Sequence, residues 1–466
     1  MMKSTTKLTL ILCTLFMLSA CLDDDSDDDH VPIEVPEMPA PVPSDIRILH
    51  ASPDAPMVNV NADGNPIEVA QNLDYQGATS VFSVDPGTYQ ITVDALLPSD
   101  TTSTVIDAQA TLEEATDYTI LAVDNVAGLE PLIIANQDAD IGAGNLRVQV
   151  VHAAPNAPTV DIYVTAPGAD LTAEQPLDTL AFKEYTEQVE VPEGDYQIRI
   201  TAAGETTAVF DSGTVSLAAG ADLIVAATKN VDAGMSPVSL LVATTEGGSL
   251  LLDANTPAEV RAIHGIADAP AVDVLVDVAN GDDILLFDGA PFKGVTTYIE
   301  VEEGEYLLDV VADADNSIVA INDVTAAVSA GVRYTAIANN TLTNADLDFA
   351  VDDARPLATA AQVRIFHASQ ATGGVDIYVT ADGEIDSVEP TFTNVEYSTD
   401  MLTNTGYVQL APGDYVVTVT PTGTKTEAIE TGVLMLEAAK IYTALAVDGD
   451  MPGDGPQLIL ADDFIE

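Results

Sequence analysis

The sequence predicts an all-β protein: four tandem immunoglobulin-like antiparallel β-sandwich domains that follow a signal peptide and a disordered stalk. Three observations predict this. A histidine-containing phrase occurs four times, at intervals of 102, 112 and 103 residues. Short runs of alternating apolar residues are separated by Gly, Pro, Asp and Asn, and no window has a sustained helical period. The hydrophobic fraction of 47% is enough for several cores, and a chain of 466 residues is too long for one.

The first element, residues 1–20, has the pattern of a lipoprotein signal peptide. Lys3 and Lys7 precede an apolar stretch, 8–18, that is too short to span a membrane. The residues “LSAC” that end at Cys21 resemble the bacterial lipobox, and this resemblance implies that Cys21 is lipidated and begins the mature protein. An ordinary secretory signal with an incidental Cys21 is the alternative.

The residues around Cys21 also indicate the compartment. Leu22 stands where an aspartate would favour inner-membrane retention, so we expect a lipid anchor in the outer membrane of a bacterial cell envelope. Cys13 lies inside the signal peptide. The mature chain is therefore predicted to have no disulfide and no free thiol, which excludes thiol chemistry and cysteine-ligated metal.

The second element, residues 21–45, is an acidic and proline-rich tether. Six aspartates occur within the seven residues 23–29, and prolines recur from Pro32 to Pro43. Mutual repulsion and polyproline conformations favour a semi-rigid stalk. His30 belongs to this tether and is expected to be solvated.

Four β-sandwich repeats follow, predicted at 46–143, 144–257, 258–359 and 360–466. Each begins with a strand that ends in histidine, and each later has a turn that closes on a tyrosine and leads into a core strand. The histidines are His50, His152, His264 and His367, and the tyrosines are Tyr89, Tyr196, Tyr306 and Tyr415.

The repeated phrases resemble a known family. “ILHASPDAP” from Ile48 and “IHGIADAPAVDVLVD” from Ile263, with the later “PGTY” turn, resemble the bacterial family called domain of unknown function 4397. This resemblance covers about nine tenths of the chain, everything after the tether. The fourth copy departs from it, because “HASQATGG” lacks both prolines. The family implies secreted or surface-anchored tandem domains and no particular activity.

Strand parity predicts the role of the histidines. In a strand, residues two apart share a face, so His50 lies with Ile46 and Ile48 on the apolar face, beside a proline-rich loop. A neutral imidazole can donate from one nitrogen and accept at the other, so the ring can tie this loop to the sheet. The alternative is a zinc or copper ligand, but each repeat has one histidine and no cysteine.

The opposite face of the same strands carries arginines. If the next strand forms a hairpin with the first, Arg261 could pair with Asp273 and Arg364 with Asp376 as cross-strand ion pairs. Solvated surface charges are the alternative. Neither interpretation is catalytic.

Charge excludes several functions. With a formal net charge of -61 we expect no nucleic-acid partner, because phosphates are repelled. No nucleophile elbow, HExxH, Walker or GxGxxG motif occurs, so we do not expect an enzyme.

No cofactor is certain. Calcium is the best candidate, since “ANGDD” at 279, “VADADNS” at 311 and “VDGDMPGDG” at 447 place carboxylates on loops.

These patterns favour a non-enzymatic, lipid-anchored spacer or binding module for a glycan or protein partner at the cell surface. A calcium-binding surface protein braced by acidic loops is the first alternative. A carboxylate-dependent hydrolase is the second, although proximity of carboxylates carries little information in a chain with 75 of them.

Overall fold

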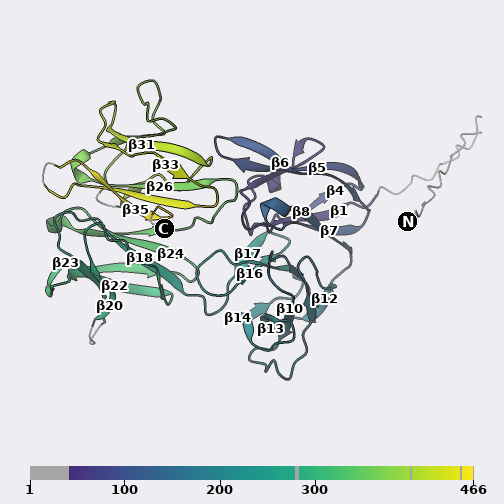
Figure 1. Ribbon diagram of the computed structural model, residues 1–466. Helices are drawn as coiled ribbons and strands as arrows, with labels where there is room; N and C mark the ends of the chain where they lie inside the picture. Colours follow the sequence, from purple (N-terminus) through teal and green to yellow (C-terminus); the bar gives the residue numbers. More distant parts are fainter. Residues whose placement is uncertain (1–40, 279–282, 399–400, 452–453, 465–466) are drawn as a thin grey trace, which may run out of the picture. The chain divides into compact units, whose positions relative to one another are not determined.

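The computed structural model describes residues 41–278, 283–398, 401–451 and 454–464. The predicted signal peptide, Cys21, His30 and the tether up to residue 40 lie outside the described residues. The described strands fall into four successive groups, 44–137, 145–251, 258–351 and 361–462 (Figure 1). The first strand begins at Ser44, so the last two residues of the predicted tether belong to the first sandwich.

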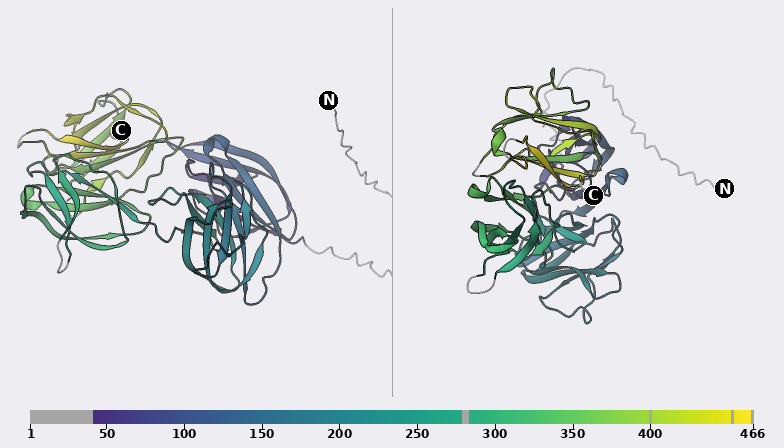
Figure 2. Two further views of the ribbon diagram at one scale, coloured as in Figure 1. Left: turned by 60° about the horizontal axis from the view of Figure 1, so that its bottom comes forward. Right: turned by 60° about the vertical axis from the view of Figure 1, so that its left-hand side comes forward.

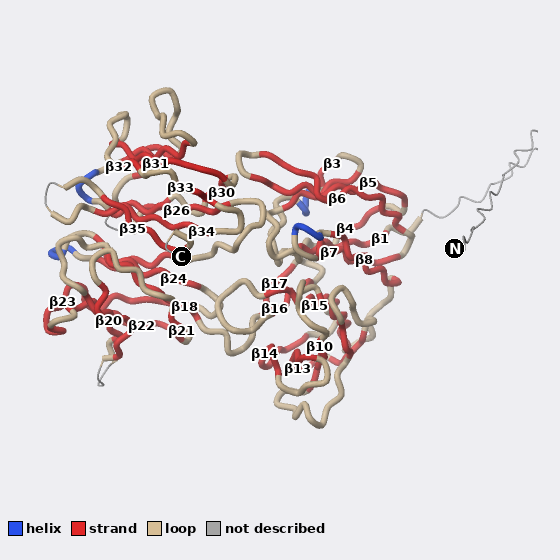
Figure 3. The backbone as a smooth tube through the Cα atoms, in the orientation of Figure 1, coloured by secondary structure: helices blue, strands red, loops and turns tan. Residues whose placement is uncertain are grey.

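Each repeat has two layers of strands, which Figures 1 and 2 show as stacked ribbons. The helical elements of the described part are short 3₁₀ turns among tan loops in Figure 3, namely η1 (Glu68–Ala70), η2 (Val126–Gly128), η3 (Leu342–Asn344) and η4 (Gln370–Thr372). No helix in the described part is long and apolar enough to cross a membrane.

The first two repeats show the common plan. Repeat 1 contains β1 (Ser44–His50), β2 (Val58–Ala62), β3 (Asn65–Pro66), β4 (Phe82–Val84), β5 (Gly87–Leu97), β6 (Thr101–Leu112), β7 (Thr116–Val123) and β8 (Glu130–Gln137). Its sheets have the orders β4-β1-β7-β8 and β3-β2-β5-β6. Repeat 2 contains β9 (Asn145–His152), β10 (Val160–Thr165), β11 (Asp178–Leu180), β12 (Val189–Pro192), β13 (Gly194–Ala202), β14 (Ala208–Leu217), β15 (Asp222–Lys229), β16 (Val238–Ala243) and β17 (Gly248–Leu251). Its sheets are β12-β9-β15-β16-β17 and β11-β10-β13-β14.

Repeats 3 and 4 follow the same plan. Repeat 3 contains β18 (Ala258–His264), β19 (Val272–Val276), β20 (Ile284–Ala290), β21 (Ile299–Val301), β22 (Gly304–Ala312), β23 (Asp315–Val328), β24 (Arg333–Asn339) and β25 (Asp346–Val351), in sheets β21-β18-β24-β25 and β20-β19-β22-β23. Repeat 4 contains β26 (Ala361–Ala368), β27 (Val375–Thr380), β28 (Phe392–Val395), β29 (Thr403–Asn404), β30 (Val408–Leu410), β31 (Gly413–Pro421), β32 (Ile429–Glu430), β33 (Leu434–Leu436), β34 (Ile441–Val447) and β35 (Gln457–Asp462). Its sheets are β29-β26-β34-β35 and β28-β27-β31-β32, with β30 on β26 and β33 on β31.

The prediction of tandem all-β sandwiches is confirmed, with one refinement of strand direction. Most pairs are antiparallel, but the histidine strand of every repeat runs parallel to the strand that contains the later “DYT”-like phrase. The parallel pairs are β1 with β7, β9 with β15, β18 with β24 and β26 with β34. Alternation along a strand does not distinguish the two directions, which is why the sequence did not reveal the parallel pair.

Each sandwich has its own core between its two sheets. In repeat 1, Ile46 and Ile48 of β1 face Val58 and Val60 of β2 in one apolar cluster. Corresponding clusters fill repeats 2, 3 and 4. On its other face each histidine strand carries an arginine and one buried apolar residue next to the histidine, which is Leu49, Val151, Ile263 or Phe366.

That second face joins the repeats in pairs. One apolar cluster combines Leu49, Leu121, Val123 and Ile134 of repeat 1 with Val151, Ile224, Ala226 and Leu241 of repeat 2. A second combines Ile263 and Ile337 of repeat 3 with Phe366, Leu445, Val447 and Ile459 of repeat 4. Repeats 1 and 2, and repeats 3 and 4, therefore share buried apolar contacts.

Candidate functional site

The four histidines occupy the same place in each repeat, at or next to the end of the first strand. Each ring Nε2 lies within hydrogen-bond distance of a carbonyl oxygen in the following loop. The pairs are His50 with Pro56 O at 3.1 Å, His152 with Pro158 O at 3.1 Å, His264 with Pro270 O at 3.0 Å and His367 with Gly373 O at 2.6 Å. A carbonyl only accepts, so Nε2 carries the proton and Nδ1 is left as an acceptor.

The remaining nitrogen faces the backbone of the loop. In repeats 1 and 3, Nδ1 accepts from the backbone N–H of Ser52 at 3.3 Å and of Ile266 at 3.4 Å. In repeats 2 and 4, the Nδ1 atoms of His152 and His367 are buried without a hydrogen-bond partner in the described part of the chain.

Burial keeps these rings neutral. Each histidine is at most 2% exposed. Desolvation lowers the pKa of His50 to about 4, and it also lowers the pKa of His152, His264 and His367. The rings therefore join a loop to a sheet and have no free access to substrate. This geometry supports the structural interpretation of the phrase over a metal ligand.

Sequence reasoning missed the aromatic partner of each histidine. The rings meet edge to face, with centroids 6.1 to 6.3 Å apart, in the pairs His50–Tyr75, His152–Phe182, His264–Phe292 and His367–Tyr397. A threonine shortly after each aromatic residue accepts a backbone N–H from the histidine strand; these are Thr79, Thr186, Thr296 and Thr405. In the first three repeats the spacing from aromatic residue to threonine is four, and this repeated spacing is the signal that could have found them.

The four signature tyrosines close their own turns. Each phenolic O–H donates to the carbonyl four residues earlier, at 2.7 to 2.8 Å; the acceptors are Asp85 for Tyr89, Pro192 for Tyr196, Glu302 for Tyr306 and Ala411 for Tyr415. This is the tyrosine-corner geometry expected at the entry to a core strand.

The predicted ion pairs are wrong. Arg261 lies on β18 and Asp273 on β19, and these strands belong to different sheets. Asp273 instead accepts the backbone N–H of Gly289. Asp376 likewise lies in the other sheet from Arg364, and it accepts the backbone N–H groups of Asn394 and Gly423.

The arginines pair across the repeats instead. Arg261 reaches Asp462 of repeat 4 at 2.5 Å, and Arg364 pairs with Asp352 of repeat 3. Arg47 reaches Asp222 of repeat 2 at 3.3 Å. The three arginine side chains are only 3% to 6% exposed. Desolvation lowers the pKa of Arg47, although a guanidinium stays charged at neutral pH.

Most of the cations serve such contacts. Of the 12 lysines and arginines after residue 40, eight bind a group in another repeat within the described residues. They are Arg47, Arg147, Lys183, Arg261, Lys293, Arg333, Arg355 and Arg364. In this acidic chain, most of the few positive charges therefore lie in contacts between repeats.

Carboxylates gather at one predicted calcium loop. Asp313 of “VADADNS” lies with Asp273 and Asp288, and one oxygen from each falls within 4.8 Å of the others. Asp273 is buried and the other two are exposed. Part of “ANGDD” and part of “VDGDMPGDG” lie outside the described residues. Calcium takes about six to eight oxygen ligands, so three carboxylates alone do not define a calcium site.

Repeat 3 also has an exposed apolar sheet face. Leu285 and Leu307 are 50% and 40% exposed, and Val319 is 46% exposed. Leu285 pairs with Leu275, and Val319 with Val311, on the outer side of the sheet β20-β19-β22-β23. Asp273, Asp283 and Asp309 lie among these residues and line the same hollow.

The same outer face is covered in repeats 2 and 4. In repeat 2 the β10–β11 loop reaches it through Gly168, whose N–H donates to Gln197 of β13. In repeat 4, Lys425 lies over the Tyr378 ring and donates to the carbonyls of Ile385 and Val388 in the β27–β28 loop. Among the described residues, which leave out 279–282 of the β19–β20 loop, repeat 3 therefore presents an apolar and acidic surface where repeats 2 and 4 carry a loop.

Comparison with known proteins gives a family and little more. The family model described as “Domain of unknown function (DUF4397)” matches residues 44–163 and 258–378, which together make just over half of the chain. No curated protein matches the sequence.

Two solved structures are similar to parts of this chain. The Bacillus anthracis TIE protein is 11% identical, with a TM-score of 0.16, over 84% of this chain and 68% of that one. The product complex of the multi-modular glycogen-degrading pneumococcal virulence factor SpuA is 8% identical, with a TM-score of 0.16, over 82% of this chain and 37% of that one. Scores this low carry no functional argument.

Proposed function

This chain belongs to the DUF4397 family, whose description names no activity. We propose a non-enzymatic function, because the repeated histidines and tyrosines bond to the backbone of their own loops and turns. The protein is a lipid-anchored component of the bacterial cell envelope, in the outer membrane. Its four sandwiches act as a spacer and as a binding module for a glycan or protein partner at the surface.

One observation carries the spacer function: the repeats are joined in pairs by buried apolar clusters and by six of the 12 lysines and arginines after residue 40. Leu241 of repeat 2 and Phe366 of repeat 4 are both at most 1% exposed within these shared clusters. Sandwiches held in this way resist bending between the members of a pair, unlike domains on flexible linkers. A stiff support is what surface display requires.

X-ray scattering of the full chain tests the spacer function. Replacement Leu241→Asp buries a charge in the contact between repeats 1 and 2, so we expect a larger radius of gyration and a broader distance distribution. Met235→Asp is the matched control, because Met235 is 91% exposed. Circular dichroism checks that the strands persist. Identical scattering from the wild type and Leu241→Asp would contradict a stiff pair.

Membrane attachment has its own test. Cys21→Ser removes the only thiol that the predicted mature chain can acylate, so the protein should move from the membrane fraction to the soluble fraction. Cys13→Ser, within the predicted signal peptide, should leave the fractionation unchanged. Continued membrane association of Cys21→Ser would refute the lipid anchor.

The uncovered face of repeat 3 favours a protein partner, since its apolar side chains are rimmed by carboxylates that suit a basic and apolar segment. A cysteine placed at Leu285 for crosslinking in intact cells should give an adduct. Thr111→Cys, on an exposed strand of repeat 1, is the control. Equal yields from both positions would argue against a partner on this face.

Calcium binding is the second candidate, and the grouping of Asp273, Asp288 and Asp313 is the observation that favours it. Calorimetric titration of the full chain in physiological salt should then give a saturable signal that Asp288→Asn removes. Weak heat without saturation, unchanged in Asp288→Asn, would assign the acidity to solvation alone.

A further inference from the structure

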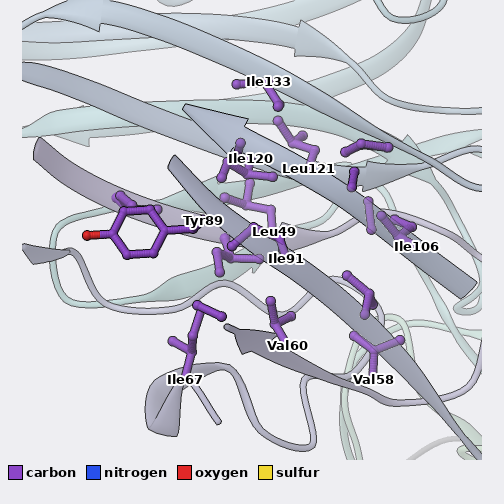
Figure 4. Close-up of a pocket in the computed structure, with 18 of the residues that line it drawn as sticks. Leu49, Val58, Val60, Ile67, Tyr89, Ile91, Ile106, Ile120, Leu121 and Ile133 are labelled. Carbon is purple, nitrogen blue, oxygen red and sulfur yellow. The ribbon is translucent and has the colours of Figure 1, made fainter. Parts of the chain in front are cut away.

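The first sandwich encloses an apolar cavity. Its volume is about 100 Å³, and it lies between the two sheets of repeat 1. Figure 4 shows Val58 and Val60 on one side of it, with Ile91, Ile106 and Ile120 also among the lining residues. Every lining residue is apolar except His50, Gln109 and the Tyr89 hydroxyl, and none is charged.

Matched positions show that this opening is particular to repeat 1. Ile91 and Ile120 are only half-buried, although they point into the core. The residues two positions after the signature tyrosine in the other repeats, Ile198, Leu308 and Val417, are 5%, 3% and 7% exposed. Those in register with Ile120 are Val225, Ala336 and Ala444, at 2%, 1% and 6%. At these two matched positions, solvent therefore reaches the interior of the first sandwich and of no other repeat.

A small side chain helps to leave the space. Ala110 of β6 pairs with Tyr89, whereas the residues that pair with the equivalent tyrosines in repeats 2 and 4 are Val215 and Leu434. Repeat 3 also has alanine there, Ala326, but its neighbours bury it to 4% exposure. The fold thus accommodates a larger side chain at this position, but repeat 1 has only the methyl group of Ala110.

The most exposed residues of the cavity wall lie on β6 and β8, the edge strands of the two sheets: Gln109, Pro131 and Ile133, of which Ile133 is 46% exposed. Phe82 and Val84 of β4 pair with Ile46 and Ser44, and both line the cavity together with Tyr89, whose hydroxyl bonds to Asp85.

The chemistry of the lining selects the ligand. A water molecule needs two to four polar partners, and the three polar groups at this wall are bonded elsewhere or lie at the rim. His50 is bonded to Pro56 and Tyr89 to Asp85, and Gln109 is exposed. Sugars and peptides would lose their hydrogen bonds here. A volume of about 100 Å³ is below the roughly 150 Å³ that holds benzene, so the cavity suits the end of a narrow chain.

We propose that repeat 1 binds the end of one alkyl chain of an amphiphile between its two sheets, with a polar head group that carries no negative charge outside the mouth. The acidic body repels an anionic head group. This inference does not depend on acylation of Cys21. It adds a ligand class to a chain proposed above only as a spacer and surface module.

Calorimetry with a series of linear alcohols, from butanol to decanol, tests the proposal on the full chain that carries Cys21→Ser. Each added methylene should tighten binding about fourfold until the cavity is full, after which the gain should stop. Ala110→Leu fills the cavity and should weaken binding at least tenfold. Thr111→Leu adds the same group to the exposed side of the same strand and should bind like the parent.

Two results would overturn the proposal: no saturable binding of any alcohol, or equal binding by Ala110→Leu and Thr111→Leu. If Ala110→Leu failed to fold by circular dichroism, Ile91→Phe would replace it as the filling variant. Vesicles of a neutral phospholipid then identify the source of the chain. Vesicle binding that is lost in Ala110→Leu assigns a bilayer lipid, whereas binding of free alcohols alone assigns a soluble amphiphile.

Discussion

At the scale of single residues, the aromatic partner of the histidine in repeats 1 to 3 adjoins a residue that contacts another sandwich. The aromatic residue on the histidine ring is followed, in repeats 1 to 3, by a residue with positive φ: Gln76, Lys183 and Lys293. Gln76 donates to Thr228 and Ser239 of repeat 2, while Lys183 reaches Asp124 of repeat 1 and Lys293 reaches Asp450 of repeat 4. A left-handed backbone costs a non-glycine residue about 1 kcal/mol or more, which these contacts offset.

Removal of one histidine should destabilise its own repeat. In His264→Ala the Pro270 carbonyl and the Ile266 N–H lose their partner, and the Phe292 edge loses its contact, so we expect a loss of about 2–4 kcal/mol. Calorimetric melting of the full chain measures this as a lower transition for part of the molecule. Metal analysis should give no zinc or copper in either the wild type or the variant. Stoichiometric metal that disappears with His264 would contradict the structural role.

Acidification should destabilise the fold by protonating the same histidine rings. The folded pKa of His50, about 4, lies below its unfolded value of about 6.5, so the unfolded state takes up the proton first. Protonation of His50 leaves the free energy of unfolding unchanged above pH 6.5. Between pH 6.5 and pH 4 it lowers the free energy of unfolding progressively, by about 3 kcal/mol in total. His50→Gln removes this titration, and the stability difference between it and the wild type should shift in favour of Gln by that amount. The carboxylates titrate in both proteins and cancel. A difference that stays constant with pH would refute the shifted pKa.

At the scale of strands and sheets, parity predicted which way a side chain points but not which sheet it belongs to. The prediction that His50 lies with Ile46 and Ile48 depends only on alternation along one strand. The pairing of Arg261 with Asp273 also required that consecutive strands be neighbours, and β18 and β19 lie in opposite sheets. The shared clusters were likewise invisible, because an apolar residue on either face has the same letter whether it meets its own core or another repeat.

The carboxylate of Asp352 is the centre of the contact between repeats 3 and 4. It bonds to Thr335, Tyr298 and Arg364, and its side chain is 6% exposed. Asp352→Asn leaves the buried guanidinium of Arg364 without its counter-charge, so we expect a loss of about 3–5 kcal/mol. Chemical denaturation measures it. Exposed Asp353→Asn is the adjacent control and should change stability by less than about 0.5 kcal/mol. Equal losses would show that total charge, rather than this network, sets the effect.

At the scale of the whole molecule, a net charge of -61 opposes the compact state everywhere except where the cations lie. Salt should therefore stabilise the protein, because the screening length falls from about 30 Å at 0.01 M to about 10 Å at 0.1 M. Salt weakens the ion pairs between repeats 3 and 4 less than exposed ones, since the side chains of Arg261 and Arg364 are at most 4% exposed. We expect the melting temperature to rise with sodium chloride and then level off. A falling melting temperature would mean that exposed ion pairs dominate.

The same titration separates general screening from specific calcium binding. At matched ionic strength, magnesium and calcium chlorides screen equally, so equal melting temperatures are expected if the 75 carboxylates act only as a charged surface. An octahedral, strongly hydrated magnesium ion does not replace calcium in a loop site with many oxygen ligands. An additional rise with calcium that saturates, and that Asp288→Asn removes, would assign bracing to the Asp273 cluster. A rise that survives this substitution would place calcium on other carboxylates of the chain.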